Sequence, residues 1–149
     1  MTAGEYCNRE VIIVEPTISV TEAAALMRRH HVGDLVVVEK EGEEARPIGI
    51  ITDRDIVIEV VAQKIDPDSL TVKDIMSTDP VRVAETVSLL DTLELMKQRG
   101  VRRVLVIADS GGLQGLLSAD DAIELIAEQL NDLTQLVDRE ITREQKQHP

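Results

Sequence analysis

Residues 14–38 read VEPTISVTEAAALMRRHHVGDLVVV, and residues 83–107 read VAETVSLLDTLELMKQRGVRRVLVI. The two stretches align at an offset of 69 in the numbering and are identical at 7 of 25 positions, and most of the other positions keep their apolar or polar character. Downstream, GIITDRD at 49–55 aligns with GLLSADD at 115–121 at an offset of 66. Similarity of a chain to itself at a nearly constant offset indicates two copies of one structural unit.

The change of offset lies in the loop that precedes the last strand of each copy. The first copy has the charged segment EKEGEEARP at 39–47, and the second has the shorter ADSGG at 108–112. Surface loops tolerate such differences in length. We therefore expect a long charged loop in the first copy and a tight hairpin through Gly111-Gly112 in the second.

Each copy has a pattern that predicts the order β-α-β-β-α. Short apolar stretches predict strands, and apolar residues at intervals of three and four predict amphipathic helices. In the first copy the predicted elements are a strand at 11–14, a helix at 20–30, strands at 35–38 and 47–51, and a helix from 53. In the second copy they are a strand at 81–83, a helix at 89–99, strands at 104–107 and 113–117, and a helix from 119. The fold class is thus mixed α and β (α/β, or α+β), built from two β-α-β-β-α repeats.

The boundaries of the copies divide the chain into four parts. Repeat 1 covers residues 8–63, a linker covers 64–76, repeat 2 covers 77–130, and a helical extension and tail cover 131–149. The extension is predicted from the stripe Ile123, Ile126, Leu130, Leu133 and Val137, whose steps of three and four make two heptads. This stripe predicts a helix that runs past residue 135 and packs either on its own module or on a second chain.

The composition excludes several classes of protein. The chain has 149 residues with one Tyr and neither Phe nor Trp, so its core must be aliphatic. A formal net charge of −12 argues against general binding to nucleic acid or to an anionic membrane. A single cysteine, Cys7, excludes an intrachain disulfide and a multi-cysteine metal site. Because no apolar run approaches a membrane span and no basic start precedes an apolar stretch, we expect a cytoplasmic protein.

Both copies carry the motif Gly-apolar-apolar-(Thr/Ser)-x-x-Asp where a predicted strand ends and a helix begins. Its residues are Gly49, Thr52 and Asp55 in the first copy and Gly115, Ser118 and Asp121 in the second. One explanation is structural, because Ser/Thr-x-x-Asp is a capping box that satisfies two backbone N–H groups at a helix start. The other is functional, because a strand-to-helix junction attracts phosphate and an adjacent carboxylate accepts hydrogen bonds from a ribose diol.

The residues do not form a pattern typical of an enzyme. No nucleophile with a base, no pair of catalytic acids and no set of metal ligands is apparent, so we expect no catalytic residues and no metal site. His30 and His31 are adjacent and point apart on a helix, which makes a role near the helix C-terminus the simpler interpretation.

The sequence resembles a tandem pair of CBS (cystathionine β-synthase) domains, also called a Bateman module, of the stand-alone bacterial type. The resemblance rests on TEAAALMRRHHVGDLVVVE and PIGIITDRDI in the first copy, and on VSLLDTLELMKQRGVRRVLVI and GLLSADDAI in the second. The segment TVKDIM (71–76) resembles the usual entry between the repeats. The likeness covers about residues 8–130, and GIITDRD matches the family motif more closely than GLLSADD does.

The resemblance implies two repeats related by a pseudo-twofold axis, with two clefts between them that bind AMP, ADP, ATP, NAD or S-adenosylmethionine. It implies that the motif aspartate holds the ribose and that backbone and aliphatic groups of the opposite repeat hold the adenine. The residues implied for the first cleft are Thr52, Arg54, Asp55, Met76, Val81, Val101 and Arg102. Those implied for the second are Cys7, Ile12, Val32, Gly33, Arg103, Ser118, Asp120 and Asp121.

The two clefts are expected to differ in charge. Arg54 and Arg102 are both available to a phosphate in the first cleft, with Asp34 near them. In the second, Asp120 replaces the arginine and only Arg103 opposes it. A carboxylate near a phosphate is unfavourable unless a cation such as Mg²⁺ lies between them. We therefore expect the first cleft to be better suited to a phosphorylated ligand.

The implied function is a regulatory sensor that binds an adenine nucleotide and requires no other cofactor. It would act as a homodimer, through helix faces and the 123–137 stripe, on its own dimer or on a regulated protein whose identity is open. The alternative is an interaction and dimerisation scaffold whose clefts are vestigial, which the looser GLLSADD motif favours.

Overall fold

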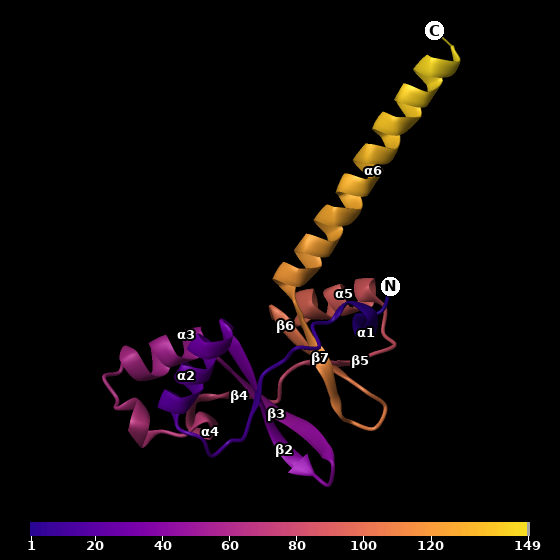
Figure 1. Cartoon of the computed structure of the whole chain (residues 1–149). Helices are drawn as coiled ribbons and strands as arrows, with labels where there is room; N and C mark the ends of the chain where they lie inside the picture. The colour runs from indigo at the N-terminus through magenta and orange to yellow at the C-terminus, as the bar shows by residue number, and fades with distance from the viewer. Residues whose placement is uncertain (149) are drawn as a thin grey trace. The chain divides into compact units, whose positions relative to one another are not determined.

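The computed structural model describes residues 1–148, and the chain divides into two compact units, Met1–Leu117 and Ser118–Pro149 (Figure 1). The helices of the first unit are α1 (Ala3–Tyr6), α2 (Val20–His30), α3 (Asp53–Ile56), the π-helical turn η1 (Val57–Val61), the 3₁₀ turn η2 (Pro67–Ser69), α4 (Val72–Ile75) and α5 (Leu89–Arg99). Its strands are β1 (Ile13–Val14), β2 (Asp34–Glu41), β3 (Glu44–Thr52), β4 (Ser77–Thr78), β5 (Arg82–Ala84), β6 (Arg103–Ile107) and β7 (Leu113–Ser118). The second unit is α6 (Ala119–Gln147).

The strands form two sheets, one for each repeat, and β4 at residues 77–78 joins the sheet of repeat 1. The first sheet has the order β1-β2-β3-β4 and the second has the order β5-β6-β7. The first strand of each repeat pairs parallel with the second, as Ile13 with Val36 and Arg82 with Leu105. Ile13 and Arg82 differ by 69 in the numbering, and so do Val36 and Leu105, so the repeat in the sequence is also a repeat in the structure.

Residues 35–38 of the strand β2 are buried on both faces because they lie between two cores. Leu35 and Val37 face the core of repeat 1, together with Ile51 and Val72. Their neighbours Val36 and Val38 point to the other face, as alternate residues of a strand do, and pack with Leu105 and Leu116 of repeat 2. The continuous apolar run LVVV thus serves both its own repeat and the junction between the repeats.

The N-terminal residues complete repeat 2 in the way that residues 70–78 complete repeat 1. The amides of Ala3 and Gly4 donate to the carbonyls of Val87 and Glu85 at 2.8 and 2.9 Å. The amides of Val72 and Lys73 donate to Ile18 and Pro16 at 2.9 and 3.1 Å, and every donor and acceptor is shifted by the same 69. In Figure 1, α1 accordingly lies beside α5.

The sequence predicted the long helices within one residue. α2 begins at Val20 and ends at His30, and α5 begins at Leu89 and ends at Arg99. The hydroxyls of Ser19 and Ser88 cap them by accepting from the amide three residues on, at 3.1 Å in each case. α6 begins at residue 119 and extends past residue 135, as its apolar stripe indicated. The helix from residue 53 also forms, but it winds as a π-helical turn from Val57.

The expected long loop at 39–47 is wrong. β2 and β3 continue through that segment as paired strands to the pair Glu41 with Glu44. The turn between them is made by Gly42, whose φ of 65° suits glycine, and a β-bulge lies between Val37 and Val38. The prediction failed because strands were identified by alternating apolar residues. A hairpin tip that extends beyond the core has no buried face, so its residues show no such alternation.

Candidate functional site

The first motif lies where β3 passes into α3, and its two polar side chains form a closed capping box. The amide of Asp55 donates to Oγ1 of Thr52 at 3.1 Å, and the amide of Thr52 donates to Oδ2 of Asp55 at 2.9 Å. The structural explanation of the motif is therefore correct for this copy. The box engages Oδ2 of Asp55, so Oδ1 can accept a further hydrogen bond from a ligand while the cap stays closed.

Residues from two segments of repeat 1 meet at this helix start. The amide of Asp53 donates to the carbonyl of Gly33 at 2.9 Å, and Asp34 is the register partner of Thr52 across β2 and β3. A Cβ atom on Gly33 would lie 3.2 Å from Oδ2 of Asp53. Gly33, implied for the second cleft by the resemblance, thus lies against the first motif. Asp53 was not among the predicted residues, and its carboxylate adds negative charge at the helix start.

An ion pair joins repeat 2 to the residues around the first motif. Nε of Arg103 lies 2.8 Å from Oδ2 of Asp34, and the two side chains are 33% and 25% exposed. Arg103 was implied for the second cleft, where it was the only cation. Here its guanidinium contacts the residue in register with Thr52 of the first motif. The offset of 69 puts these opposite charges at one position of the two repeats, but the alignment alone does not indicate that the two positions meet.

A sulfur atom lies against the motif glycine in each repeat. A Cβ atom on Gly49 would lie 2.5 Å from Sδ of Met76, and one on Gly115 would lie 2.6 Å from Sγ of Cys7. Cys7 and Met76 are equivalent positions, because the offset of 69 relates them. Burial raises the pKa of the Cys7 thiol above its ordinary value, more than the positive charge of Arg9 lowers it. Cys7 is therefore a protonated, half-buried thiol at neutral pH.

The other residues implied for the first cleft lie at the edges of repeat 2 and on α3. The Val81 carbonyl accepts from the Leu105 amide at 2.9 Å, and the Val101 amide donates to the Met96 carbonyl at 3.1 Å. The side chains of Arg54 and Arg102 are exposed. These contacts set the backbone positions of Val81 and Val101, while their role toward a ligand stays a prediction.

The second motif begins the second unit. The amide of Asp121 donates to Oγ of Ser118 at 3.1 Å, so the hydroxyl half of the expected box is present at the start of α6. Asp120 follows the cap with an exposed side chain. Ile12 and Val32 lie in the first unit and pack against the core of repeat 1. The second cleft stays a prediction, because its motif and its other residues belong to different units.

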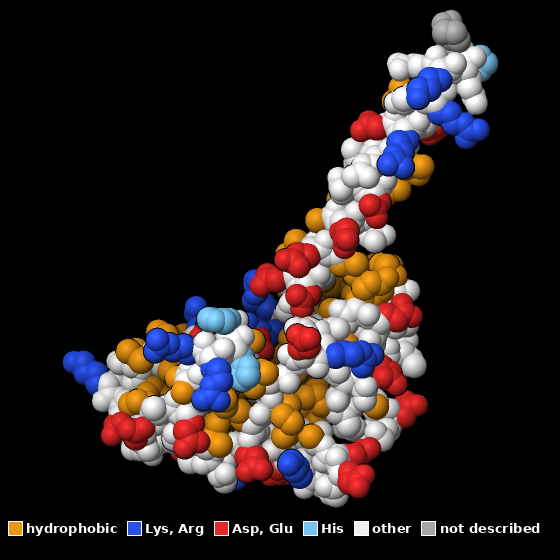
Figure 2. Space-filling model, in the orientation of Figure 1, with side chains coloured by type: hydrophobic (Ala, Val, Ile, Leu, Met, Phe, Trp, Pro, Cys, Tyr) orange, Lys and Arg blue, Asp and Glu red, His pale blue; other side chains and the backbone are white. Residues whose placement is uncertain are grey.

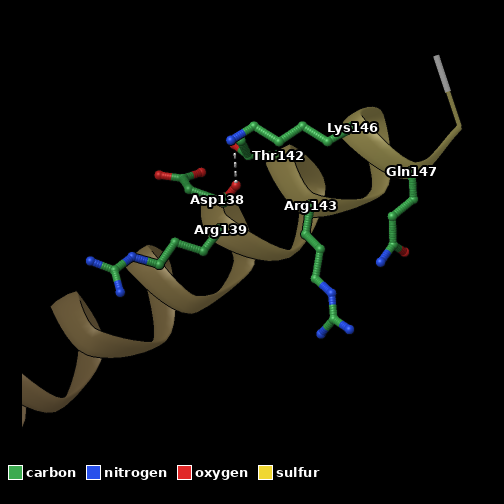
Figure 3. A pocket seen from close by; sticks show the side chains of 6 residues that line it. All are labelled: Asp138, Arg139, Thr142, Arg143, Lys146 and Gln147. Carbon is green, nitrogen blue, oxygen red and sulfur yellow. Dashed lines mark hydrogen bonds between the residues drawn. The ribbon is translucent and has the colours of Figure 1, made fainter.

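A groove along α6 offers little chemistry. The groove of about 500 Å³ in Figure 3 is lined by side chains of α6 alone, and Thr142 within it donates to the carbonyl of Asp138 at 2.9 Å. A groove along one helix has no opposite wall to enclose a ligand. Within residues 1–148, no three His, Cys, Asp or Glu side chains lie close enough together to hold a metal ion. The helices of that range include none with the length and apolar character to cross a bilayer.

Comparison with protein families gives two matches along the chain. The model of the CBS domain matches residues 3–62 and 72–128. An uncharacterized protein of Methanopyrus kandleri is 38% identical over 125 residues, which are 84% of this chain and 62% of that protein. The CBS domain-containing protein YhcV of Bacillus subtilis is 38% identical over 112 residues, 75% of this chain and 76% of that protein. The chain thus spans less than two-thirds of the first of these relatives.

Solved structures share the fold. A conserved protein from Pyrococcus horikoshii has a TM-score of 0.73 at 26% identity and covers 83% of this chain and 90% of that one. A CBS domain protein from Pyrobaculum aerophilum complexed with AMP has a TM-score of 0.72 at 27% identity, over 81% and 89% of the two chains. Hypoxic Response Protein I, solved with two coordinated zinc ions, has a TM-score of 0.69 at 31% identity, over 83% and 98%.

Proposed function

The chain belongs to the CBS domain family, and from that premise we propose that it is a regulatory module that binds an adenosine nucleotide between its repeats. The observation that carries the proposal is the capping box of Thr52 and Asp55, which holds a half-buried carboxylate at a strand-to-helix junction. The complex of the Pyrobaculum aerophilum protein with AMP supports the choice of ligand class.

The ribose is the part of the ligand for which this site is best suited. Oδ1 of Asp55 would accept hydrogen bonds from the ribose hydroxyls, while Oδ2 keeps its bond to the Thr52 amide. A hydrogen bond that involves a charged group is worth roughly 1.5–3 kcal/mol, and a diol can donate two. The cap holds the carboxylate in one orientation before the ligand arrives, which lowers the entropic cost of binding.

The adenine and the phosphate would be held by the remaining residues of the first cleft. Met76, Val81 and Val101 offer aliphatic and thioether surface, and the backbone beside them offers hydrogen-bonding groups to the base. Arg54 and Arg102 would bind the phosphate. A cation such as Mg²⁺ would offset the carboxylate of Asp53 for a ligand with more phosphates, whereas Asp34 is already paired with Arg103.

The second cleft would bind the same class of ligand more weakly. Its predicted residues place Asp120 where the first motif has Arg54, and the Arg103 guanidinium already pairs with Asp34. Both differences lower the positive potential at that cleft. We therefore expect one strong and one weak site for AMP, ADP, ATP or NAD.

The regulatory role follows from binding without catalysis. A ligand that contacts both repeats stabilises one relative arrangement of them, and a dimer or a regulated protein that contacts the same repeats can respond to that arrangement. Such a module needs no catalytic residue, and we propose none.

Calorimetric titration with AMP tests the proposal, and the chain offers a matched control. Asp55→Ala should weaken binding at the strong site roughly tenfold to a hundredfold, through the loss of one charged hydrogen bond. Asp74→Ala should bind AMP as the wild type does, although Asp74 closes the same kind of capping box at the start of α4. Asp121→Ala should change the strong site little.

Two results would contradict the proposal. If Asp55→Ala and Asp74→Ala bind AMP equally well, the Thr52–Asp55 motif is only a cap. If the wild type gives no heat and no thermal shift with AMP, ADP, ATP or NAD, the scaffold function replaces the sensor. A ligand at about 100 times its dissociation constant should stabilise the folded chain by roughly 2.7 kcal/mol, so a shift would be measurable.

A further inference from the structure

The helix α6 carries an apolar stripe that is continuous over five turns. Its seven large apolar side chains are 43% to 64% exposed, and they are Ile123, Ile126, Leu130, Leu133, Leu136, Val137 and Ile141. Figure 2 shows apolar side chains along this helix among acidic and basic ones. The stripe is about 27 Å long at 1.5 Å per residue. An exposed apolar surface of this extent is typical of an interaction site.

We propose that α6 pairs antiparallel with α6 of a second copy of this chain. The charge of the helix argues against other classes of partner, since it carries eight acidic and three basic residues. A net charge of −5 disfavours an anionic lipid surface and nucleic acid. A second copy presents the same stripe, and an isologous contact buries each stripe against its equivalent.

The charge distribution along α6 selects the antiparallel direction. The half at 119–132 contains five acids and neither Lys nor Arg, whereas the half at 133–147 contains three of each sign. A parallel pair would bring the two acidic halves together. An antiparallel pair brings each acidic half against the half that holds Arg139, Arg143 and Lys146.

The positions of the apolar residues select the same direction. The steps of three and four that begin at Ile123 continue to Glu140 and Glu144. In a parallel pair each of these glutamates would face the same glutamate of the second copy. In an antiparallel pair centred near residue 132, Ile126 faces Val137 and Leu130 faces Leu133. Ile123 faces position 140, beside Ile141, so that Glu140 no longer faces a second glutamate.

Light scattering on the full chain tests the pairing with matched variants. The wild type should be a dimer at tens of micromolar, and Leu130→Glu/Leu133→Glu should shift it to a monomer of about the 16.5 kDa chain mass. Asn131→Glu/Gln135→Glu adds the same charges on the side of α6 away from the stripe and should leave the dimer intact. A monomeric wild type, or a dimer equally unaffected by both variants, would overturn the proposal.

Disulfide crosslinking tests the direction. In a Cys7→Ala background, Ile123→Cys and Ile141→Cys should each fail to form a disulfide dimer alone, because the two equivalent sites lie far apart in an antiparallel pair. A mixture of the two variants should crosslink, since a disulfide needs Cα atoms roughly 4.4–6.8 Å apart. Crosslinking of each variant with itself and not with the other would show a parallel pair and refute the antiparallel one.

Discussion

Asp34 and Arg103 hold the same position in the two repeats, related by the offset of 69, and they pair with each other at 2.8 Å. Residues at equivalent positions meet only on the axis that relates the two copies, so this pair lies at the pseudo-twofold axis. Two identical repeats would bring like side chains together there. The divergence of this position into an acid and a base converts a contact that would be repulsive or neutral into an attraction between the repeats.

The first prediction concerns that attraction. A double-mutant cycle of Asp34→Ala and Arg103→Ala should give a coupling free energy of about 1 kcal/mol, because the bond is charge-assisted but still partly exposed to water. The coupling should fall in 1 M NaCl, where the Debye length is roughly 3 Å. Denaturant unfolding of the wild type and the three variants measures it. Additive single effects would mean that the pair contributes nothing to the junction.

A second prediction concerns the motif glycines. Gly49→Ala and Gly115→Ala should each lower the free energy of unfolding by about 1–3 kcal/mol, because the new Cβ would overlap a sulfur and a backbone oxygen. For Gly49 the backbone oxygen is that of Ser77 at 2.8 Å, and for Gly115 it is that of Asn8 at 2.6 Å.

Gly112→Ala is the control for the glycine prediction. Its Cβ would have its nearest neighbour at 3.6 Å, an ordinary contact distance, so the variant should be close to the wild type in stability. Thermal unfolding of the three variants makes the comparison. Equal stability of all three would show that the close approach of Met76 and Cys7 to the glycines does not matter.

A third prediction concerns the end of α2. His31 caps this helix with φ of 54°, and its equivalent in repeat 2 is Gly100 with φ of 64°. His31→Gly should raise the free energy of unfolding by about 0.5–1 kcal/mol, because glycine adopts the left-handed conformation without strain and this gain exceeds its entropic cost. His30→Gly, in the last helical position, should lower it by about 1 kcal/mol. Urea unfolding should therefore show changes of opposite sign in the free energy of unfolding of the two variants. A lower free energy of unfolding for both variants would contradict the prediction.

A fourth prediction concerns Cys7 and pH. Burial raises the pKa of its thiol in the folded chain, so the thiol stays protonated to a higher pH in the folded state than in the unfolded state. The contribution of this pKa difference to the free energy of unfolding is fully present below the ordinary thiol pKa. It is lost as pH rises through the pKa of the thiol in the folded state. The wild type should therefore lose more stability than Cys7→Ala between about pH 8.5 and the folded pKa.

Alkylation of Cys7 gives an independent measurement of the same shift. Iodoacetamide should react with the folded chain at pH 8 more slowly than with the chain in denaturant, because only the thiolate reacts and less of it is present. The rate should continue to rise with pH after the denatured control has reached its plateau. Equal rates in the two states at pH 8 would contradict a raised pKa.

The sequence by itself determined the elements whose causes are local. The apolar periodicity of 20–30 and 89–99, with a serine before each helix, sets α2 and α5, because a capping hydroxyl and an amphipathic face act within one or two turns. The offset of 69 identified the two repeats, and the Ser/Thr-x-x-Asp spacing located both motifs. These signals involve residues at most a few positions apart, or a comparison of the chain with itself.

Only the tertiary structure decided the features that depend on distant residues. α1 is four residues long, too short to form a stable helix alone, and its place against α5 rests on hydrogen bonds to Val87 and Glu85. The hairpin at 39–47 and the partner of Arg103 likewise depend on which strands and repeats meet. Pairing between the two repeats is set by the burial of LVVV between two cores, and no local pattern records what lies on its far side.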